Sequence, residues 1–349
     1  MNQFAFEYRD PLFGIIFIFS LIFIISFLTY TFSAYKEKLA RREYRKLLKR
    51  FELGKLKEDD YVHLYKTYNL PFDSILLLAS TFLHKGDYTK AITVYLALLE
   101  HVKDRVKKEE LLELLGSTYF KGGFLQRSRE IFLKILKFSP RNKEALKYLL
   151  LINEKLKDYD KAIDVINSLE ELKVDTIRDR VYIETLIILN DPIISFEKKT
   201  EKLYSFFKMN RVIERIFLEF LLQYNKDFFW KNLDDFDISK IIDRLWYLDF
   251  NDIDFDKVEQ NPILKELYNA KGFLNNLKES ENFNFEILML VNRNKTKIKA
   301  DLNFEYLCTS CKKSHPIYST RCPHCHSILT FKVRHSLIKG FNEENQSLQ

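Results

Sequence analysis

The chain carries Cys308-Thr-Ser-Cys311 and, ten residues further on, Cys322-Pro-His-Cys325, and these two motifs hold all four of its cysteines. Two Cys-x-x-Cys motifs let four thiolates surround one tetrahedral ion at about 2.3 Å per bond, because each two-residue spacer turns both sulfurs toward one point. The spacing predicts a metal site, and a small zinc ribbon is the favoured interpretation. Iron in the same ligand set, ordinary buried thiols and a pair of disulfides are the alternatives.

The sequence on either side of the motifs alternates as strands do. Asn303-Phe-Glu-Tyr-Leu-Cys308 leads in, and Ser327-Ile-Leu-Thr-Phe-Lys-Val333 leads out. We call each Cys-x-x-Cys turn a knuckle, the first at Cys308–Cys311 and the second at Cys322–Cys325. Two strands around two knuckles form a rubredoxin-like or zinc-ribbon layout, which we place at residues 301–335. Three histidines lie nearby and, with four thiolates present, are expected in solvent or outside the ligand shell: His315, His324 and His326. The polar end, residues 336–349, is predicted to be disordered.

No residue from Pro11 to Tyr35 is charged, and most are large and apolar. At ~1.5 Å per residue this stretch is long enough to cross a ~30 Å hydrocarbon layer. We predict a single transmembrane helix at residues 11–34, behind a short tail at residues 1–10. A cleaved signal peptide is the alternative, but the acidic residues Glu7 and Asp10 argue against it.

A basic segment follows this stretch, whereas Arg9 alone precedes it; the segment contains Lys36, Lys38, Arg41, Arg42, Arg45, Lys46, Lys49 and Arg50. The positive-inside rule then places everything after about residue 35 in the cytoplasm and the N-terminal tail on the other side of the membrane. We expect a basic juxtamembrane helix at residues 35–60, near anionic lipid. The reducing cytoplasm favours metal-bound thiols over disulfides.

The composition favours long helices, because glycine (8) and proline (7) are scarce in 349 residues. Residues 72–100, 109–138 and 143–172 align as three helix-turn-helix units, each opening its second helix on a small residue: Ala91, Ser128 or Ala162. This pattern is similar to the tetratricopeptide repeat. We predict a mainly α protein with a tetratricopeptide-type α-solenoid at residues 61–175 and degenerate helical repeats at residues 176–300. A non-repeating helical bundle is the alternative.

Residues on the first helix of each unit, away from its apolar positions, are the candidates for a partner-binding groove: His84, Ser117, Lys121, Lys147 and Glu154. Trp230 and Trp246 anchor a partner or pack the core, and packing is favoured because large aromatics dominate cores. The net charge of +7 arises from 56 basic and 49 acidic residues, so no nucleic-acid partner is expected.

The chain has a predicted membrane span, then helical repeats and then a zinc ribbon. This order resembles the lipopolysaccharide assembly protein B family of Gram-negative inner membranes. The resemblance implies an adaptor that brings a membrane-bound AAA+ protease to the deacetylase committing carbon to lipid A. It also implies that the ribbon docks on the repeats and that the four cysteines hold the metal. The membrane would then be a bacterial inner membrane, with the N-terminal tail in the periplasm and the later domains in the cytoplasm. Lys312 departs from the family, which usually has glycine after the first knuckle, and Ile328 stands near a usual tryptophan.

Catalysis is not expected. Four thiolates close the coordination shell, whereas catalytic zinc keeps an open position, and the sequence has no phosphate-cradling glycine loop and no nucleophile elbow. We expect a membrane-tethered adaptor that is not an enzyme and that forms complexes with proteins, among them copies of itself. A rubredoxin-like iron electron carrier and a general scaffold for another envelope system are the alternatives.

Overall fold

The computed structural model describes residues 11–52, 60, 72–294 and 299–340. Contacts between residues divide the chain into two compact units, Met1–Ile152 and Asn153–Gln349. Helices dominate among the described residues, so the predicted mainly α class is confirmed. The predicted N-terminal tail at 1–10 lies outside the described residues. So do residues 53–59 of the predicted basic helix and residues 61–71 of the predicted solenoid.

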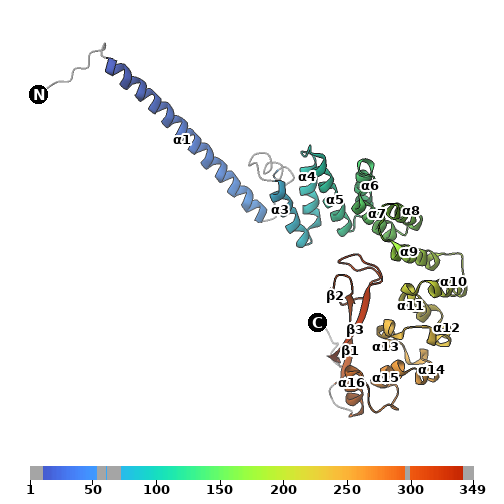
Figure 1. Cartoon of the computed structure of the whole chain (residues 1–349). Helices are drawn as coiled ribbons and strands as arrows, with labels where there is room; N and C mark the ends of the chain where they lie inside the picture. Colours follow the sequence, from blue (N-terminus) through green and yellow to red (C-terminus); the bar gives the residue numbers. More distant parts are fainter. Residues whose placement is uncertain (1–10, 53–59, 61–71, 295–298, 341–349) are drawn as a thin grey trace. The chain divides into compact units, whose positions relative to one another are not determined.

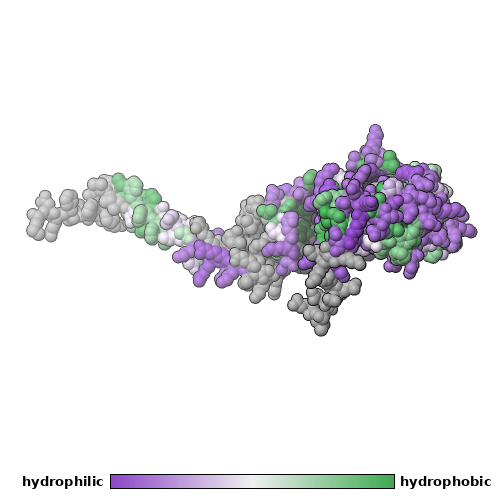
Figure 2. All heavy atoms as spheres, turned by 90° about the horizontal axis from the view of Figure 1, so that it is seen from below, coloured by the Kyte–Doolittle hydropathy of each residue, from purple (hydrophilic) through white to green (hydrophobic). Residues whose placement is uncertain are grey.

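Helix α1 (Pro11–Glu52) is one unbroken helix of 42 residues. Its stretch Phe17–Lys36 has a mean hydropathy of 2.0 and is not buried, so α1 is long and apolar enough to cross a membrane. Figure 2 shows this apolar surface giving way to hydrophilic side chains further along the helix. The predicted spanning segment and the predicted basic helix are thus parts of the same element as far as Glu52.

Helix pairs occupy the three predicted repeat units (Figure 1). They are α3 (Phe72–His84) with α4 (Tyr88–Leu99), α5 (Arg105–Lys121) with α6 (Leu125–Phe138), and α7 (Lys143–Lys155) with α8 (Tyr159–Glu171). The division between the two units falls inside α7. The identification of these pairs as tetratricopeptide repeats stays a prediction.

The second helix of each pair carries a small residue near its start, at the position that the repeat pattern predicts. Ala91, Ser128 and Ala162 are fully buried. In the second pair the Ser128 hydroxyl donates a hydrogen bond to the Gly116 carbonyl at 2.7 Å. A Cβ atom on Gly116 would lie 2.8 Å from the Phe132 ring, so only glycine lets α5 and α6 approach this closely.

The turns inside the three pairs have the same hydrogen bonds. The amides of Asp87, Phe124 and Asp158 donate to carbonyls five residues back, on Phe82, Tyr119 and Asn153. The residue before each of these donors has a positive φ: 78° at Gly86, 80° at Gly123 and 58° at Lys157. This is the Schellman ending of a helix, and it explains why the repeat pattern contains Gly86 and Gly123.

Unit 2 continues with shorter helices, and the predicted helical character of residues 176–300 is observed. They are α9 (Ile177–Asn190), α10 (Phe196–Met209), η1 (Arg211–Ile213), α11 (Glu214–Tyr224), α12 (Lys226–Lys231), η2 (Leu233–Asp235), η3 (Ile238–Ile241), α13 (Ile242–Trp246), η4 (Phe250–Asp252), α14 (Phe255–Gln260), α15 (Pro262–Ala270) and α16 (Phe283–Arg293). Helix α15 ends at Ala270, because Gly272 has φ 82° and the Phe273 amide closes a Schellman turn on the Tyr268 carbonyl.

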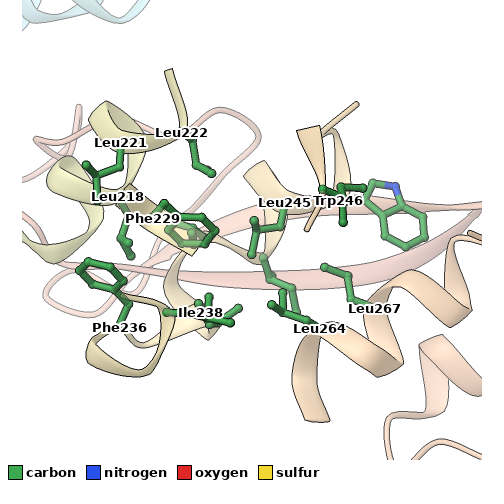
Figure 3. Close-up of a cluster of buried hydrophobic side chains, with 14 of the residues drawn as sticks. Leu218, Leu221, Leu222, Phe229, Phe236, Ile238, Leu245, Trp246, Leu264 and Leu267 are labelled. Carbon is green, nitrogen blue, oxygen red and sulfur yellow. The ribbon is translucent and has the colours of Figure 1, made fainter. Parts of the chain in front are cut away.

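The core of unit 2 is rich in aromatic and branched side chains. Figure 3 shows Phe229, Phe236 and Trp246 pointing into one cluster with leucines from α11, α13 and α15. Trp230 and Trp246 are each only 5% exposed, so both pack the core, as favoured from the sequence. Leu302, Phe304 and Tyr306 of the ribbon belong to the same cluster.

A three-stranded antiparallel sheet closes the described chain, with β1 (Ala300–Cys308) between β2 (Ser314–His315) and β3 (Phe331–Lys339). The predicted entry strand is confirmed. The predicted exit strand at 327–333 is wrong in its bounds, because residues 327–330 close the second knuckle through the Arg321↔Ile328 bridge, and Leu329 has φ 51°.

The tail predicted at residues 336–349 also begins too early. Strand β3 extends to Lys339 because β1 begins at Ala300 and pairs with it along its whole length, from Ala300↔Lys339 to Cys308↔Phe331. Residues 341–349 lie outside the described residues. Strand β1 packs against α16, which places the sheet beside the last helices of unit 2 (Figure 1).

Candidate metal centre

The two knuckles are built alike, residue for residue. In the first, the Cys308 amide donates to the Lys313 carbonyl and the Lys312 amide donates to the Cys308 carbonyl, both at 2.9 Å. In the second, the Cys322 amide donates to the Ser327 carbonyl and the His326 amide donates to the Cys322 carbonyl, again at 2.9 Å. Each turn therefore folds back on its first cysteine and presents both sulfurs on one side.

The residue after each second cysteine has a left-handed backbone. The φ angle is 61° at Lys312 and 59° at His326. Side chains other than glycine enter this region at a cost of roughly 1–2 kcal/mol. Glycine would adopt this conformation at Lys312 without that cost.

The four sulfurs come together at the ends of the knuckles. All four Sγ atoms lie within 4.8 Å of one another. The Sγ atoms of Cys308 and Cys325 are 3.7 Å apart, and so are those of Cys311 and Cys322. A tetrahedral ion with ~2.3 Å bonds to sulfur requires S–S edges of about 3.8 Å. The residues therefore fit a four-thiolate metal site, as predicted from their spacing.

Hydrogen bonds prepare Cys308 to be a thiolate. Burial opposes its ionisation, but the Cys311 amide and the hydroxyls of Ser327 and Thr330 lower its pKa to about 5. The Thr330 Oγ1 atom lies 3.3 Å from the Cys308 sulfur. Burial also acts against ionisation of Cys325, and the Ser327 hydroxyl, 3.0 Å from its sulfur, lowers the pKa of that thiol. Ser327 and Thr330 are supporting residues that sequence reasoning missed.

Cys322 behaves in the opposite way. Burial raises the pKa of its thiol to about 12, against the lowering effect of the Cys325 and His324 amides. Four thiolates cannot all be charged this close together without a cation, because like charges raise the pKa of one another. A bound ion supplies that cation, and metal binding at this site would release protons.

The three histidines lie outside the four-sulfur cluster. His324 is exposed and His326 is half-buried. His315 is the nearest, with its Nε2 atom 3.7 Å from the Cys322 sulfur and its ring edge-on to Phe331. These positions agree with the expectation that cysteines alone are the ligands.

Arg321, next to the ligand Cys322, ties the second knuckle to helices of unit 2. Its guanidinium donates to Glu154 Oε2 at 2.5 and 2.9 Å and to Asp179 Oδ1 at 2.9 Å, and it also donates to the His326 carbonyl. Burial alone would lower the pKa of Arg321, but the two carboxylates raise it. Only 14% of its side chain is exposed. We call this set, Arg321 with Glu154 and Asp179, the arginine clasp.

A second contact holds the first strand of the ribbon. The Arg215 guanidinium forms a two-pronged pair with the buried Asp243 carboxylate, at 2.9 and 2.7 Å. The Tyr306 hydroxyl from β1 donates to the same carboxylate at 2.8 Å, and the Tyr318 ring lies 3.8 Å from the guanidinium carbon. Together with the arginine clasp, this contact seats the ribbon on helices of unit 2. The docking on tetratricopeptide repeats that the family resemblance implies stays a prediction.

The five predicted groove residues have different surroundings in the structure. His84 and Lys121 are exposed at the ends of α3 and α5, and Lys147 on α7 pairs with Glu144 at 2.7 Å. Ser117 is half-buried and donates to the Leu114 carbonyl. Glu154 is held in the arginine clasp, so assigning it to an open groove was wrong. The only sequence signal for the clasp is an arginine beside a ligand cysteine.

No protein-family model matches this chain. No curated protein matches it either.

Proposed function

We propose that the chain is a membrane-anchored adaptor in which a structural metal holds a ribbon on a helical scaffold. The observation that carries this proposal is the cluster of four sulfurs, which lie within 4.8 Å of one another on two knuckles that connect the strands of a sheet seated on helices. A site with no open position binds no substrate at the metal, and its binding energy, on the order of 10 kcal/mol for zinc, stabilises the fold.

Zinc is the ion we assign to the site. Four thiolates bind either zinc or iron. We favour zinc, because a structural zinc site in the cytoplasm needs no redox partner. Metal analysis and absorption spectra of the purified chain test this assignment. We expect a colourless protein with one zinc per chain; a red protein with visible charge-transfer bands would show iron instead.

The partners that we propose come from the family resemblance alone. They are a membrane AAA+ protease and the deacetylase of lipid A synthesis, so the adaptor would regulate lipopolysaccharide production at the inner membrane. The exposed apolar surface of α1 supports the tether, and the helix pairs α3–α8 supply the protein-binding surface. Their identification as tetratricopeptide repeats belongs to the same proposal.

Co-purification from membranes tests the adaptor role. The full chain serves as bait, and mass spectrometry quantifies the protease and the deacetylase. Cys308→Ser should lose the metal and both partners, because the ribbon then unfolds, whereas Ser310→Ala, an exposed change in the same knuckle, should keep all three. Equal enrichment of both partners by the two variants would contradict a role for the ribbon. Enrichment of neither by the unaltered chain would contradict the proposed partners.

An electron-transfer role is the second candidate, and the exposure of Cys325 favours it. Hydrogen bonds to the sulfurs and access to solvent both tune the potential of iron held by four thiolates. A reversible one-electron wave from the iron-loaded protein, together with iron as the ion found in cells, would support this candidate. A zinc-only protein eliminates it.

A further inference from the structure

Side chains from the basic part of α1 line a pocket that has no role in the proposed adaptor function. The pocket measures about 620 Å³, and among the described residues it is lined by Tyr35, Lys38, Leu39, Arg42 and Arg45. Three cations thus share one pocket with an aromatic and an aliphatic side chain. That combination suits a ligand with both a phosphate and a hydrocarbon part.

The three cations lie on one face of the helix. Lys38, Arg42 and Arg45 are four and three residues apart, the spacing that places side chains above one another on an α-helix. Arg45 follows Lys38 by seven positions, so the two lie about 10 Å apart along the helix axis. All three side chains are exposed and free to reach an external anion.

The position of the pocket along α1 selects a lipid as the occupant. Tyr35 falls at the end of the apolar stretch Phe17–Lys36, where a helix leaves the hydrocarbon layer. Lys38 lies about 5 Å further along the axis and Arg42 about 10 Å, whereas the headgroup region is roughly 6 Å deep. Side chains of a helix lean toward its N-terminus, which here is the membrane side, so the longer Arg42 and Arg45 reach back toward the headgroups.

We propose that Lys38, Arg42 and Arg45 bind the phosphate of an anionic phospholipid, while Tyr35 and Leu39 contact the upper part of its acyl chains. Each cation near an anionic surface contributes to binding, and the contribution falls off within a Debye length of about 8–10 Å. The site depends on α1 crossing the membrane but not on the adaptor role. Loss of partner binding therefore leaves it unaffected.

Native mass spectrometry of the full chain in neutral detergent provides the test. Short-chain phosphatidylglycerol, phosphatidylcholine and inorganic phosphate are titrated separately, and the bound adducts are counted. We expect phosphatidylglycerol to bind more tightly than the other two. The variant Lys38→Gln/Arg42→Gln/Arg45→Gln should weaken the first phosphatidylglycerol adduct by roughly tenfold or more, from the contribution per cation.

A matched variant removes the same number of charges from the same helix outside the pocket: Lys36→Gln/Lys46→Gln/Lys49→Gln, all exposed positions. It should weaken the first adduct by less than about threefold, because its charges lie off the pocket. Equal losses in the two variants would overturn the site and leave only a diffuse basic surface. Tight binding of inorganic phosphate with the same dependence on Lys38, Arg42 and Arg45 would overturn the lipid as the ligand. Equal metal content in both variants controls for folding.

Discussion

Arg321 couples the chemistry of the metal site to the packing of the helices. The residue follows β2 in the chain and directly precedes Cys322, so its backbone belongs to the second knuckle while its guanidinium contacts Glu154 and Asp179. Removing one member of a buried charge pair leaves the other desolvated and unpaired, which costs more than the pair itself contributes. Arg321 should therefore be a stronger determinant of stability than any exposed charge.

Arg321→Met should lower the free energy of unfolding of unit 2 by roughly 2–4 kcal/mol, somewhat less than for a fully buried pair, because 14% of the side chain is exposed. Urea unfolding followed by tryptophan fluorescence measures this, since the only two tryptophans, Trp230 and Trp246, both lie in unit 2. Arg334→Met, an exposed arginine on β3, is the matched control and should change stability by less than about 0.5 kcal/mol. Similar losses in the two variants would show that the clasp contributes nothing specific.

The turns inside the three helix pairs have the same geometry, although only two of them have glycine at the left-handed position. The turns of the first two helix pairs use Gly86 and Gly123 at the left-handed position, whereas the third uses Lys157 with φ 58°. The hydrogen bonds are the same in all three. The turn geometry is therefore set by the helices it joins, and glycine only removes a local strain.

Lys157→Gly should stabilise unit 2 by up to about 1 kcal/mol, because glycine adopts the left-handed conformation without a Cβ clash. The change is measured by urea unfolding with tryptophan fluorescence. Asp164→Gly, at an exposed position inside α8, should instead destabilise by about 0.3 kcal/mol, the difference in helix propensity between the two residues. A loss of stability in Lys157→Gly would mean that the lysine side chain contributes more than its backbone strain costs.

For the whole molecule, we expect the metal to be a fold determinant of unit 2. Strand β1 supplies Cys308 to the site and also Leu302, Phe304 and Tyr306 to the large core cluster, so the ligands and the core share one strand. Unit 1 has a separate cluster, which contains Tyr95, Leu98 and Leu115. Loss of the ion should therefore destabilise unit 2 more than unit 1.

Chelation of the metal should remove hydrogen-exchange protection from β1, β3 and α16 while the protection of α5 and α6 stays unchanged. The reason is that the ion's binding energy folds a segment too small to fold alone. Exchange followed by mass spectrometry of the full chain in detergent measures both regions in one sample. Readdition of zinc should restore the lost protection. Equal deprotection of α5 and α6 would contradict this prediction.

Most elements were predictable from local patterns. Charge-free length indicates α1, small residues at repeat spacing indicate the helix pairs, and two Cys-x-x-Cys motifs indicate the knuckles. The errors have local causes as well. The predicted tail begins too early because β1 pairs with β3 as far as Lys339, and β3 begins four residues later than predicted because the second knuckle closes first.

The sequence by itself determined which residues can bind the metal, because a thiolate pair separated by two residues needs only a turn to converge. Only the tertiary structure decided what the ribbon touches. Glu154 and Arg321 are 167 residues apart, and their opposite charges pair only because the intervening helices bring α7 back to the second knuckle. Such pairs have no spacing rule, since burial and long-range packing select one carboxylate among many.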